Sequence, residues 1–506
     1  MKKLIAVIAL ALLAALPAAS FADAQNLIPP YHWTYHALAD LSQAGLVNEA
    51  VEPGKSAFTP EQVVSLIVFA INRAQSDPQR LREQQLQDLR QLVNGYRADL
   101  EKAGQKPDQL LSDLDSYAAQ SGLPPLTAGT DESKKLGAAA ARSVNEFAFD
   151  LYKKLAAAKG SLFLSPYSVS SALCMTYAGA RGQTAAEMEK VLRATPDVHR
   201  YMGALVNEIN AVPKDTAAVS VASALWPAAG VRLLPEFVQT VRDGYAATVS
   251  PLDYQASSVK AAAVVNNWVS KHTNGRIKNI VNAAVLNKHT QLALTNAVYF
   301  KSQWAREFEA GDTRMQSFYV SKTQTVRVPL MYEQGRFRYA KIENAAIAEL
   351  PYKNGRFSML VLLPDKNASL QALEWQLSAA GIDRWASGLK ERLLDLYLPK
   401  FHTESSFELS KTLAALGMPS AFGGTADFTG MNGTGGISIG SVLHKTFVDV
   451  AEDGTEAAAA TAVVMLTSAA PSQERPLEFR ADRPFIYLIR DHESGAIIFI
   501  GRYSGK

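Results

Sequence analysis

The sequence predicts an α+β fold, and three features carry that prediction. Beyond residue 135, helical and strand-like stretches alternate in blocks, without the strict strand–helix repeat of parallel α/β proteins. Five stretches have the composition of strands, namely residues 292–300, 357–364, 393–401, 446–450 and 485–489. The chain has 506 residues, 48% of them hydrophobic and 20% charged, so two globular units are expected from its length.

Charge and cysteine content exclude several classes of protein. The chain carries 51 Lys and Arg against 48 Asp and Glu, whereas nucleic-acid-binding proteins concentrate positive charge to neutralise phosphates. We therefore expect no nucleic acid as a partner. Cys174 is the only cysteine, which excludes an internal disulfide framework and a cysteine-rich zinc site; within its apolar run it should be a buried small hydrophobic residue. No zinc-protease, phosphate-loop or dinucleotide-binding motif occurs, so no metal and no cofactor are expected.

Residues 1–22 have the pattern of a secretory signal peptide. Lys2 and Lys3 precede an apolar run at 4–16, and a small-residue site ends at Ala22. A bilayer span takes about 20 apolar residues, so cleavage after Ala22 is favoured over a membrane anchor. The mature protein is expected outside the cytoplasm, either secreted and extracellular, periplasmic or associated with the cell envelope.

Residues 23–74 predict a small pair of helices. An aromatic opening leads into a helix that stops at Gly45, and Thr59 before Pro60 has the pattern of a cap and first turn of a second helix. The stretches HWTYHALADLSQAGLV and FTPEQVVSLI resemble one S-layer homology repeat, a cell-wall-binding module. Pro60 stands where a basic residue is usual in that family.

The S-layer-homology resemblance implies a cell-wall polymer as a partner. Tyr31, Trp33 and Tyr35 would then stack on sugars, and the alternative is that they form a plain hydrophobic core. Residues 75–121 predict a further helical region with one amphipathic helix at 79–102, because apolar residues recur there at spacings of three and four. The composition of residues 122–136 indicates a linker, followed by one large unit at 137–506.

One motif suggests an enzyme, and its context argues against that reading. GISIG around Ser438 matches the nucleophile elbow of hydrolases, with His492 later in the chain. An elbow needs a strand before the serine and a helix directly after it. Here a glycine-rich stretch precedes Ser438 and a strand-like stretch follows it, so we expect no catalytic residues and no enzyme.

The segment EDGTEAAAATAVV, residues 452–464, combines unusual features. Its four alanines favour a surface helix, yet it lies between a strand-like stretch and a proline-bearing stretch. Read as a strand, it places Thr455, Ala457, Ala459 and Thr461 on one face and Glu456 on the other. Small uncharged side chains on one face predict that the segment can be buried in a narrow slot, with Gly454 as a flexible pivot.

Seven motifs in order make residues 137–506 resemble the serpin family. They are NEFAFDLYKKL, LSPYSVSSAL, GARGQTAAEM, NNWVSKHTNGRIKNIV, LTNAVYFKSQW, ELPYKNGRFSMLVLLP and DRPFIYLIRD. The resemblance implies large mixed β-sheets with surrounding helices, an exposed reactive loop and a monomer that inhibits serine proteases. It identifies the hinge of an inhibitory member's loop as Glu452, Gly454, Thr455, Glu456, Ala457, Ala458, Ala459, Ala460 and Thr461.

The resemblance also implies residues that control opening of the main sheet. Ser165, Ser168, Asn296 and His444 match the polar positions under its middle, and Trp304 matches the tryptophan where insertion begins. In the family mechanism a serine protease cleaves the loop and forms an acyl-enzyme. The hinge then inserts as a new strand and drags the protease along, which distorts the protease's catalytic site.

The reactive bond is bounded by counting along the loop. The family's usual fourteen positions beyond Gly454 lead to Ser468 followed by Ala469, whereas counting back from ADRPF leads to Gln473. The bond is therefore expected between Leu466 and Gln473, with Ser468–Ala469 preferred. These residues are uncharged and mostly small, which favours elastase-like or subtilisin-like proteases over trypsin-like ones. A non-inhibitory binding or carrier protein of the same fold is the alternative.

Overall fold

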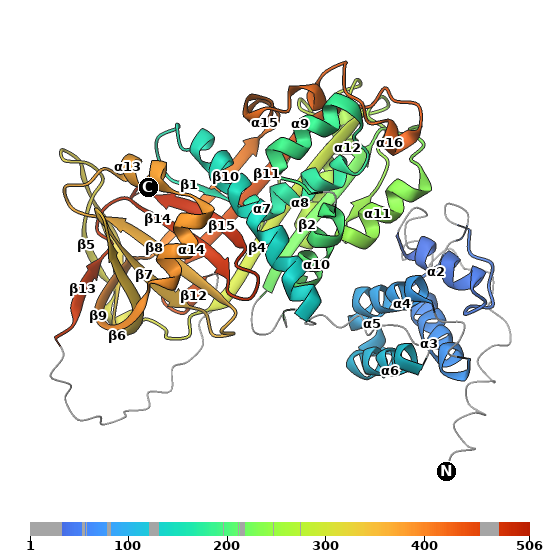
Figure 1. Ribbon diagram of the computed structural model, residues 1–506, viewed down its shortest axis with the longest axis horizontal. Helices are drawn as coiled ribbons and strands as arrows, with labels where there is room; N and C mark the ends of the chain where they lie inside the picture. The colour runs from blue at the N-terminus through green and yellow to red at the C-terminus, as the bar shows by residue number, and fades with distance from the viewer. Residues whose placement is uncertain are drawn as a thin grey trace, which may run out of the picture. The chain divides into compact units, whose positions relative to one another are not determined.

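The chain folds into two compact units, residues 1–127 and 128–506 (Figure 1). The computed structural model describes residues 33–52, 56, 58–77, 82–120, 131–195, 197–210, 212, 218–245, 247–273, 275–455 and 475–505. Among these residues no helix is both long and apolar enough to cross a membrane.

The first unit is helical throughout its described elements. These are α2 (Trp33–Gln43), α3 (Pro60–Ser76), α4 (Glu83–Gly95), α5 (Arg97–Lys102) and α6 (Pro107–Gln120). Thr59 caps α3 as the sequence predicts: its side chain accepts from the Gln62 N–H, and the Gln62 side chain accepts from the Thr59 N–H.

Two expectations for this unit need correction. The helix expected at 79–102 is broken at Tyr96, whose hydroxyl is hydrogen-bonded to Thr34 Oγ1 at 2.8 Å, and Gly95 beside it favours the break. Tyr35 is fully buried, stacks on Phe58 and accepts a hydrogen bond from the Phe58 N–H. Tyr35 therefore belongs to the hydrophobic core and is not available for stacking on a sugar. Tyr31 and the side chain of Trp33 lie outside the described residues.

The second unit contains helices and two large sheets, which confirms the α+β prediction. Its helices are α7 (Asp131–Leu155), α8 (Pro166–Tyr177), α9 (Gly182–Leu192), α10 (Val198–Asn210), α11 (Pro235–Tyr245), α12 (Ser258–His272), α13 (Leu370–Gln376), α14 (Ala379–Ser387), α15 (Ser410–Leu416) and α16 (Thr429–Asn432), with short 3-10 turns η3 (Ala310–Asp312) and η4 (Pro419–Phe422). Helix α7 begins at Asp131, so residues 131–136 of the expected linker are helical.

A nine-stranded sheet runs in the order β1-β15-β14-β8-β7-β6-β9-β13, and β5 pairs with β6. Its strands are β1 (Leu162–Leu164), β5 (Arg314–Tyr319), β6 (Thr325–Ile342), β7 (Ala345–Pro351), β8 (Phe357–Pro364), β9 (Lys390–Pro399), β13 (Leu477–Arg480), β14 (Phe485–Asp491) and β15 (Ile497–Tyr503). The stretch at 393–401 is therefore not one strand. Its residues up to Pro399 belong to β9 of this sheet, whereas Phe401 begins β10 of the other sheet. The local sequence pattern does not predict this division at Lys400.

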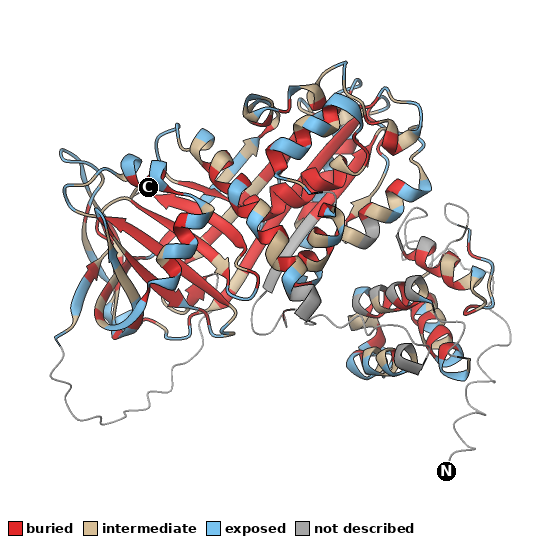
Figure 2. Ribbon diagram, in the orientation of Figure 1, coloured by how far each residue is buried: buried red, intermediate tan, exposed pale blue. Residues whose placement is uncertain are grey.

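A six-stranded sheet runs in the order β10-β11-β12-β4-β2-β3. Its strands are β2 (Ala218–Pro227), β3 (Thr248–Val249), β4 (Leu292–Gln303), β10 (Phe401–Glu408), β11 (Ile439–Val450) and β12 (Gly454–Thr455). Helix α12 packs on one face, over Ala293 and Ala297 of β4, and the main core lies on the other, under Leu294 and Val298. Both sheets are thus buried over most of their described length (Figure 2).

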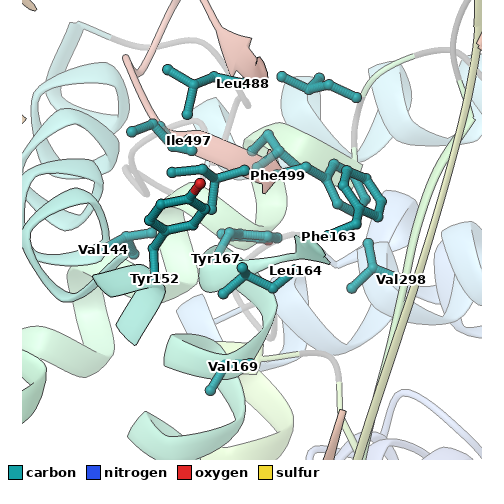
Figure 3. Packing of buried hydrophobic residues seen from close by; sticks show 14 of the residues in the cluster. Val144, Tyr152, Phe163, Leu164, Tyr167, Val169, Val298, Leu488, Ile497 and Phe499 are labelled. Carbon is teal, nitrogen blue, oxygen red and sulfur yellow. The ribbon is translucent and has the colours of Figure 1, made fainter. Parts of the chain in front are cut away.

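The core of the second unit joins the two sheets through α7 and α8. Tyr152, Phe163, Tyr167 and Phe499 are fully buried and come from α7, β1, α8 and β15 (Figure 3). Phe163 stacks on Phe499 with ring centroids 4.9 Å apart. Cys174 on α8 is buried in the same core, as the sequence predicts, and burial raises the pKa of its thiol to about 12.

Candidate functional site

The candidate site is the seam between β4 and β11, where two parallel strands of the six-stranded sheet pair directly. The paired positions run from Ile439 with Leu292 to Thr446 with Val298. Beyond Val298 the direct pairing of β4 with β11 ends, and β12 lies between the two strands. Thr455 is opposite Ser302 of β4 and Val450 of β11, and β12 is antiparallel to both. Gly454 and Thr455 of the predicted hinge thus already lie inside the sheet.

Thr455 is held by an aromatic pair at the open end of the seam. Its side chain is fully buried, and its Oγ1 lies 2.8 Å from the hydroxyl of Tyr352. The Tyr352 ring stacks on Trp304 at 4.5 Å, and Trp304 Nε1 donates to the Ala451 carbonyl at 2.9 Å. Trp304 therefore lies where the hinge enters the sheet, at the position that the resemblance implies.

Gly454 is required because two backbones approach each other closely. A Cβ at this position would lie 2.3 Å from the Ser302 carbonyl oxygen and 2.7 Å from the Gln303 Cα. Both are main-chain atoms of β4, which cannot move aside as a flexible side chain could. The sequence predicts this glycine as a pivot, and the structure adds a steric reason for it.

Glu452 fastens the chain just before the hinge. Its carboxylate accepts from Lys400 Nζ at 2.7 Å and from Thr313 Oγ1 at 2.9 Å. Burial alone would raise the pKa of this carboxyl, but these hydrogen bonds outweigh burial and lower it. Sequence reasoning missed Tyr352, Thr313 and Lys400. Tyr352 stands within the motif ELPYKNGRFSMLVLLP, whereas Lys400 and Thr313 carry no local signal.

Ser165, Ser168, Asn296 and His444 do meet beneath the seam, and we call them the sheet-opening cluster. Ser165 caps α8, and its Oγ donates to the Ile498 carbonyl of β15 at 2.7 Å. Ser168 Oγ donates to Asn296 Oδ1, and Asn296 Nδ2 donates to the Ser168 carbonyl at 2.8 Å. All four side chains are buried. The cluster links α8, β4, β11 and β15 at one point.

His444 is the one ionisable member of this cluster. Its Nε2 accepts from the Ser165 N–H at 3.0 Å, so the proton must be on Nδ1, which lies 3.2 Å from Asn296 Oδ1. The two residues are also register partners across the seam. Burial lowers the pKa of His444 to about 3 because no described acidic group offsets the loss of water.

Other predicted residues lie outside the described chain or outside the site. The hinge from Glu456 to Thr461 and the bond between Ser468 and Ala469 belong to residues 456–474, which the structure does not describe. Ser438 lies directly before β11, so a strand and not a helix follows it. The backbone of a nucleophile elbow is therefore not formed there.

Comparisons with known proteins agree with this architecture. Residues 142–505 match the family Serpin (serine protease inhibitor). An uncharacterised serpin-like protein of Thermococcus kodakarensis is 40% identical over 363 residues, which are 71% of this chain and 84% of that protein. The leukocyte elastase inhibitor of Xenopus laevis is 37% identical over 369 residues, which are 71% and 97% of the two chains. The structure of human thyroxine-binding globulin with thyroxine is 26% identical with a TM-score of 0.66, covering 73% of this chain and 99% of that one.

Two large β-sheets with surrounding helices, and a hinge segment that lies between β4 and β11, are the architecture of a serpin-like protein. The match of residues 142–505 to the family model shows that the chain belongs to the serpin family. The serpin resemblance of the C-terminal region is thereby confirmed.

The burial of neutral His444 predicts a loss of stability in acid. The unfolded state takes up a proton near pH 6.5, whereas the folded state does so only near pH 3, so the free energy of unfolding falls as the pH drops through that window. Between pH 7 and pH 4.5 we expect the wild type to lose about 2 to 3 kcal/mol more than His444→Gln. Urea denaturation of both proteins measures this, and equal losses would contradict it.

Proposed function

We propose that this protein is a secreted inhibitor of serine proteases that traps its target by inserting its cleaved loop into the six-stranded sheet. One observation carries the proposal: Thr455 already pairs with both β4 and β11, antiparallel to both, and Gly454 before it pairs with Gln303 of β4. Insertion is therefore the extension of a strand that has begun, and the chain needs no other rearrangement to start it.

Extending the observed register supports the proposal. If pairing continues regularly from Thr455, Thr461 comes opposite both Asn296 and His444, and Met465 comes opposite Leu292 at the end of β4. The side chains on the Thr455 face would then be alanines, threonine, valine and methionine. Thr461 would enter the sheet-opening cluster, where its hydroxyl can accept from His444 and donate to Asn296 in place of their present hydrogen bond.

The free energy for trapping would come from the seam. A parallel pair is slightly less stable per residue than an antiparallel one, and insertion replaces one parallel pairing by two antiparallel ladders. Apolar side chains are buried in the same step. The intact protein would persist because the closed seam is a kinetic barrier, even though the inserted form is more stable.

Chain length supports cleavage at Ser468–Ala469. After residue 465 reaches the end of β4, Ser468 is only three residues farther, or about 10 Å of extended chain. Cleavage at Gln473 would leave eight residues, about 26 Å, and a protease on so long a tether would not be pressed against the inhibitor. The small uncharged residues at 466–470 fit elastase-like or subtilisin-like proteases, and the name of the Xenopus relative, leukocyte elastase inhibitor, agrees with the first.

A serine protease that cuts after small residues should form a covalent adduct with this chain. Incubation with pancreatic elastase is expected to give an SDS-stable band and a C-terminal fragment starting at Ala469. Thr455→Arg would place a charge at a fully buried position, at a cost of about 3 kcal/mol or more, and should give cleaved loop without adduct. Thr325→Arg, on the exposed start of β6, is the matched control. Adduct formation by Thr455→Arg would contradict the mechanism.

The alternative, a non-inhibitory binding protein, is favoured by one comparison, because thyroxine-binding globulin shares the fold with thyroxine bound. Cleavage separates the two functions. Cutting the loop with a non-target protease should raise the melting temperature by tens of degrees in an inhibitor, because the new strand adds hydrogen bonds and apolar contacts at once. Differential scanning calorimetry of cut and intact protein measures this. An unchanged melting temperature would favour the binding protein.

We also propose that the chain is exported through residues 1–22 and held weakly at the cell envelope by its first unit. The S-layer-like stretches at 32–47 and 58–67 support this, although the buried Tyr35 cannot contribute to binding. A chain starting at Ala128, ahead of α7, should keep inhibition and lose sedimentation with purified cell walls. Sedimentation of the shortened chain would contradict the envelope role of the first unit, and lost inhibition would contradict the independence of the second.

A further inference from the structure

The turn between β8 and α13 presents an exposed asparagine within an acceptor sequence for N-linked glycans. Residues 367–369 read Asn-Ala-Ser, and the pattern Asn-x-Ser/Thr is the one that is glycosylated on surface loops of exported proteins. Asn367 is exposed, and its amide makes no hydrogen bond within the described part of the chain. We infer that Asn367 is a glycosylation site, modified on its side-chain nitrogen. The inference rests on the proposed export through residues 1–22.

The turn is fixed at its first residue and open at Asn367. The Ala368 N–H donates to the Asp365 carbonyl at 2.9 Å, which closes a four-residue turn with Asn367 as its third residue. The Asp365 N–H donates to the Asn344 carbonyl at 2.9 Å, and the Asp365 carboxylate accepts from Lys341 Nζ. Asp365 thus binds the turn to the end of the nine-stranded sheet. A bulky, hydrophilic group can be added to Asn367 without the loss of any of these contacts.

The third residue of the acceptor sequence keeps an accessible hydroxyl. Ser369 is exposed directly before α13, where its Oγ accepts from the Ala372 N–H at 3.4 Å. This contact uses a lone pair of the oxygen and leaves the hydroxyl proton free to donate. Residues 367–369 belong to no helix or strand. A transferase can therefore bind their backbone without breaking a sheet ladder.

The chain has one other acceptor sequence, Asn-Gly-Thr at 432–434, which is closed by its own hydrogen bonds. Asn432 is half-buried, and its Nδ2 donates to the Gly435 carbonyl at 2.8 Å. Its Oδ1 accepts from the N–H groups of Thr434 and Gly435 at 3.1 and 2.8 Å. A sugar on Nδ2 would have to fit inside this turn. The structure therefore distinguishes two similar sequence patterns and favours Asn367 alone.

The transfer needs an activated glycan as its second reactant, namely an oligosaccharide joined through diphosphate to a polyisoprenyl lipid. The Asn367 Nδ2 attacks the anomeric carbon of that glycan. A bond forms between Nδ2 and this carbon, the bond from the carbon to the diphosphate oxygen breaks, and the lipid diphosphate leaves. One amide proton passes to a base of the transferase. No oxidant or reductant takes part.

The test is peptide mapping by mass spectrometry of the full chain, purified from outside the cytoplasm of the cells that make it. The peptide that contains Asn367 should carry the added mass of a glycan, and Asn367→Gln should abolish it. Asn432→Gln is the matched control and should leave the added mass unchanged. Ser369→Ala should also abolish the added mass, whereas Ser369→Thr should retain it, because threonine keeps the hydroxyl that the acceptor sequence requires.

The failure of this inference can be told apart from that of the proposed function. An exported chain that has lost residues 1–22 and carries unmodified Asn367 would overturn the inference, and so would a glycan on Asn432. If the chain keeps residues 1–22 and stays in the cytoplasm, the proposed export fails instead. Asn367→Gln should give as much adduct with elastase as the wild type, because Asn367 lies outside the six-stranded sheet. A wild type without adduct would contradict the proposed inhibition only.

Discussion

The arrangement of the site depends on one constraint: β4 and β11 are parallel neighbours that a third strand can separate. A parallel ladder pairs less favourably than an antiparallel one, and here it stands between two antiparallel ladders, β4 with β2 and β11 with β10. The seam is therefore less stable per residue than the antiparallel ladders on its two sides. β12 lies between β4 and β11 beyond Val298 and Thr446, where these two strands no longer pair directly.

Polar contacts beneath the sheet oppose opening of this seam. His444 and Asn296 face each other across it, and Ser165 and Ser168 tie them to α8. Thr446 Oγ1 adds a hydrogen bond to the Phe163 carbonyl of β1 at 2.7 Å. Because these groups are buried, separating them without replacement would leave unpaired polar atoms at a cost of about 1 to 3 kcal/mol each. An incoming hydroxyl offers replacement partners, whereas an apolar side chain would not.

The open end of the seam has a different chemistry. Glu452 is bound by Lys400 and Thr313, Trp304 and Tyr352 stack, and Gly454 lets the hinge backbone approach β4 closely. Each contact fixes the direction in which the chain leaves β11. Two hinge residues are thereby held in the sheet while the rest of the segment lies beyond the described chain.

The sequence alone determined the family, the α+β class and all four residues of the sheet-opening cluster, because they stand at positions that the serpin resemblance identifies. It also determined the cap at Thr59 and the burial of Cys174, which follow from local pattern. Only the tertiary structure decided that the stretch at 393–401 serves two sheets, that Tyr35 is core, and that Lys400 and Thr313 hold Glu452. These contacts join residues tens to more than a hundred positions apart. Their side chains look like ordinary surface residues until the fold brings them together, and no local pattern encodes which strand will lie beside which.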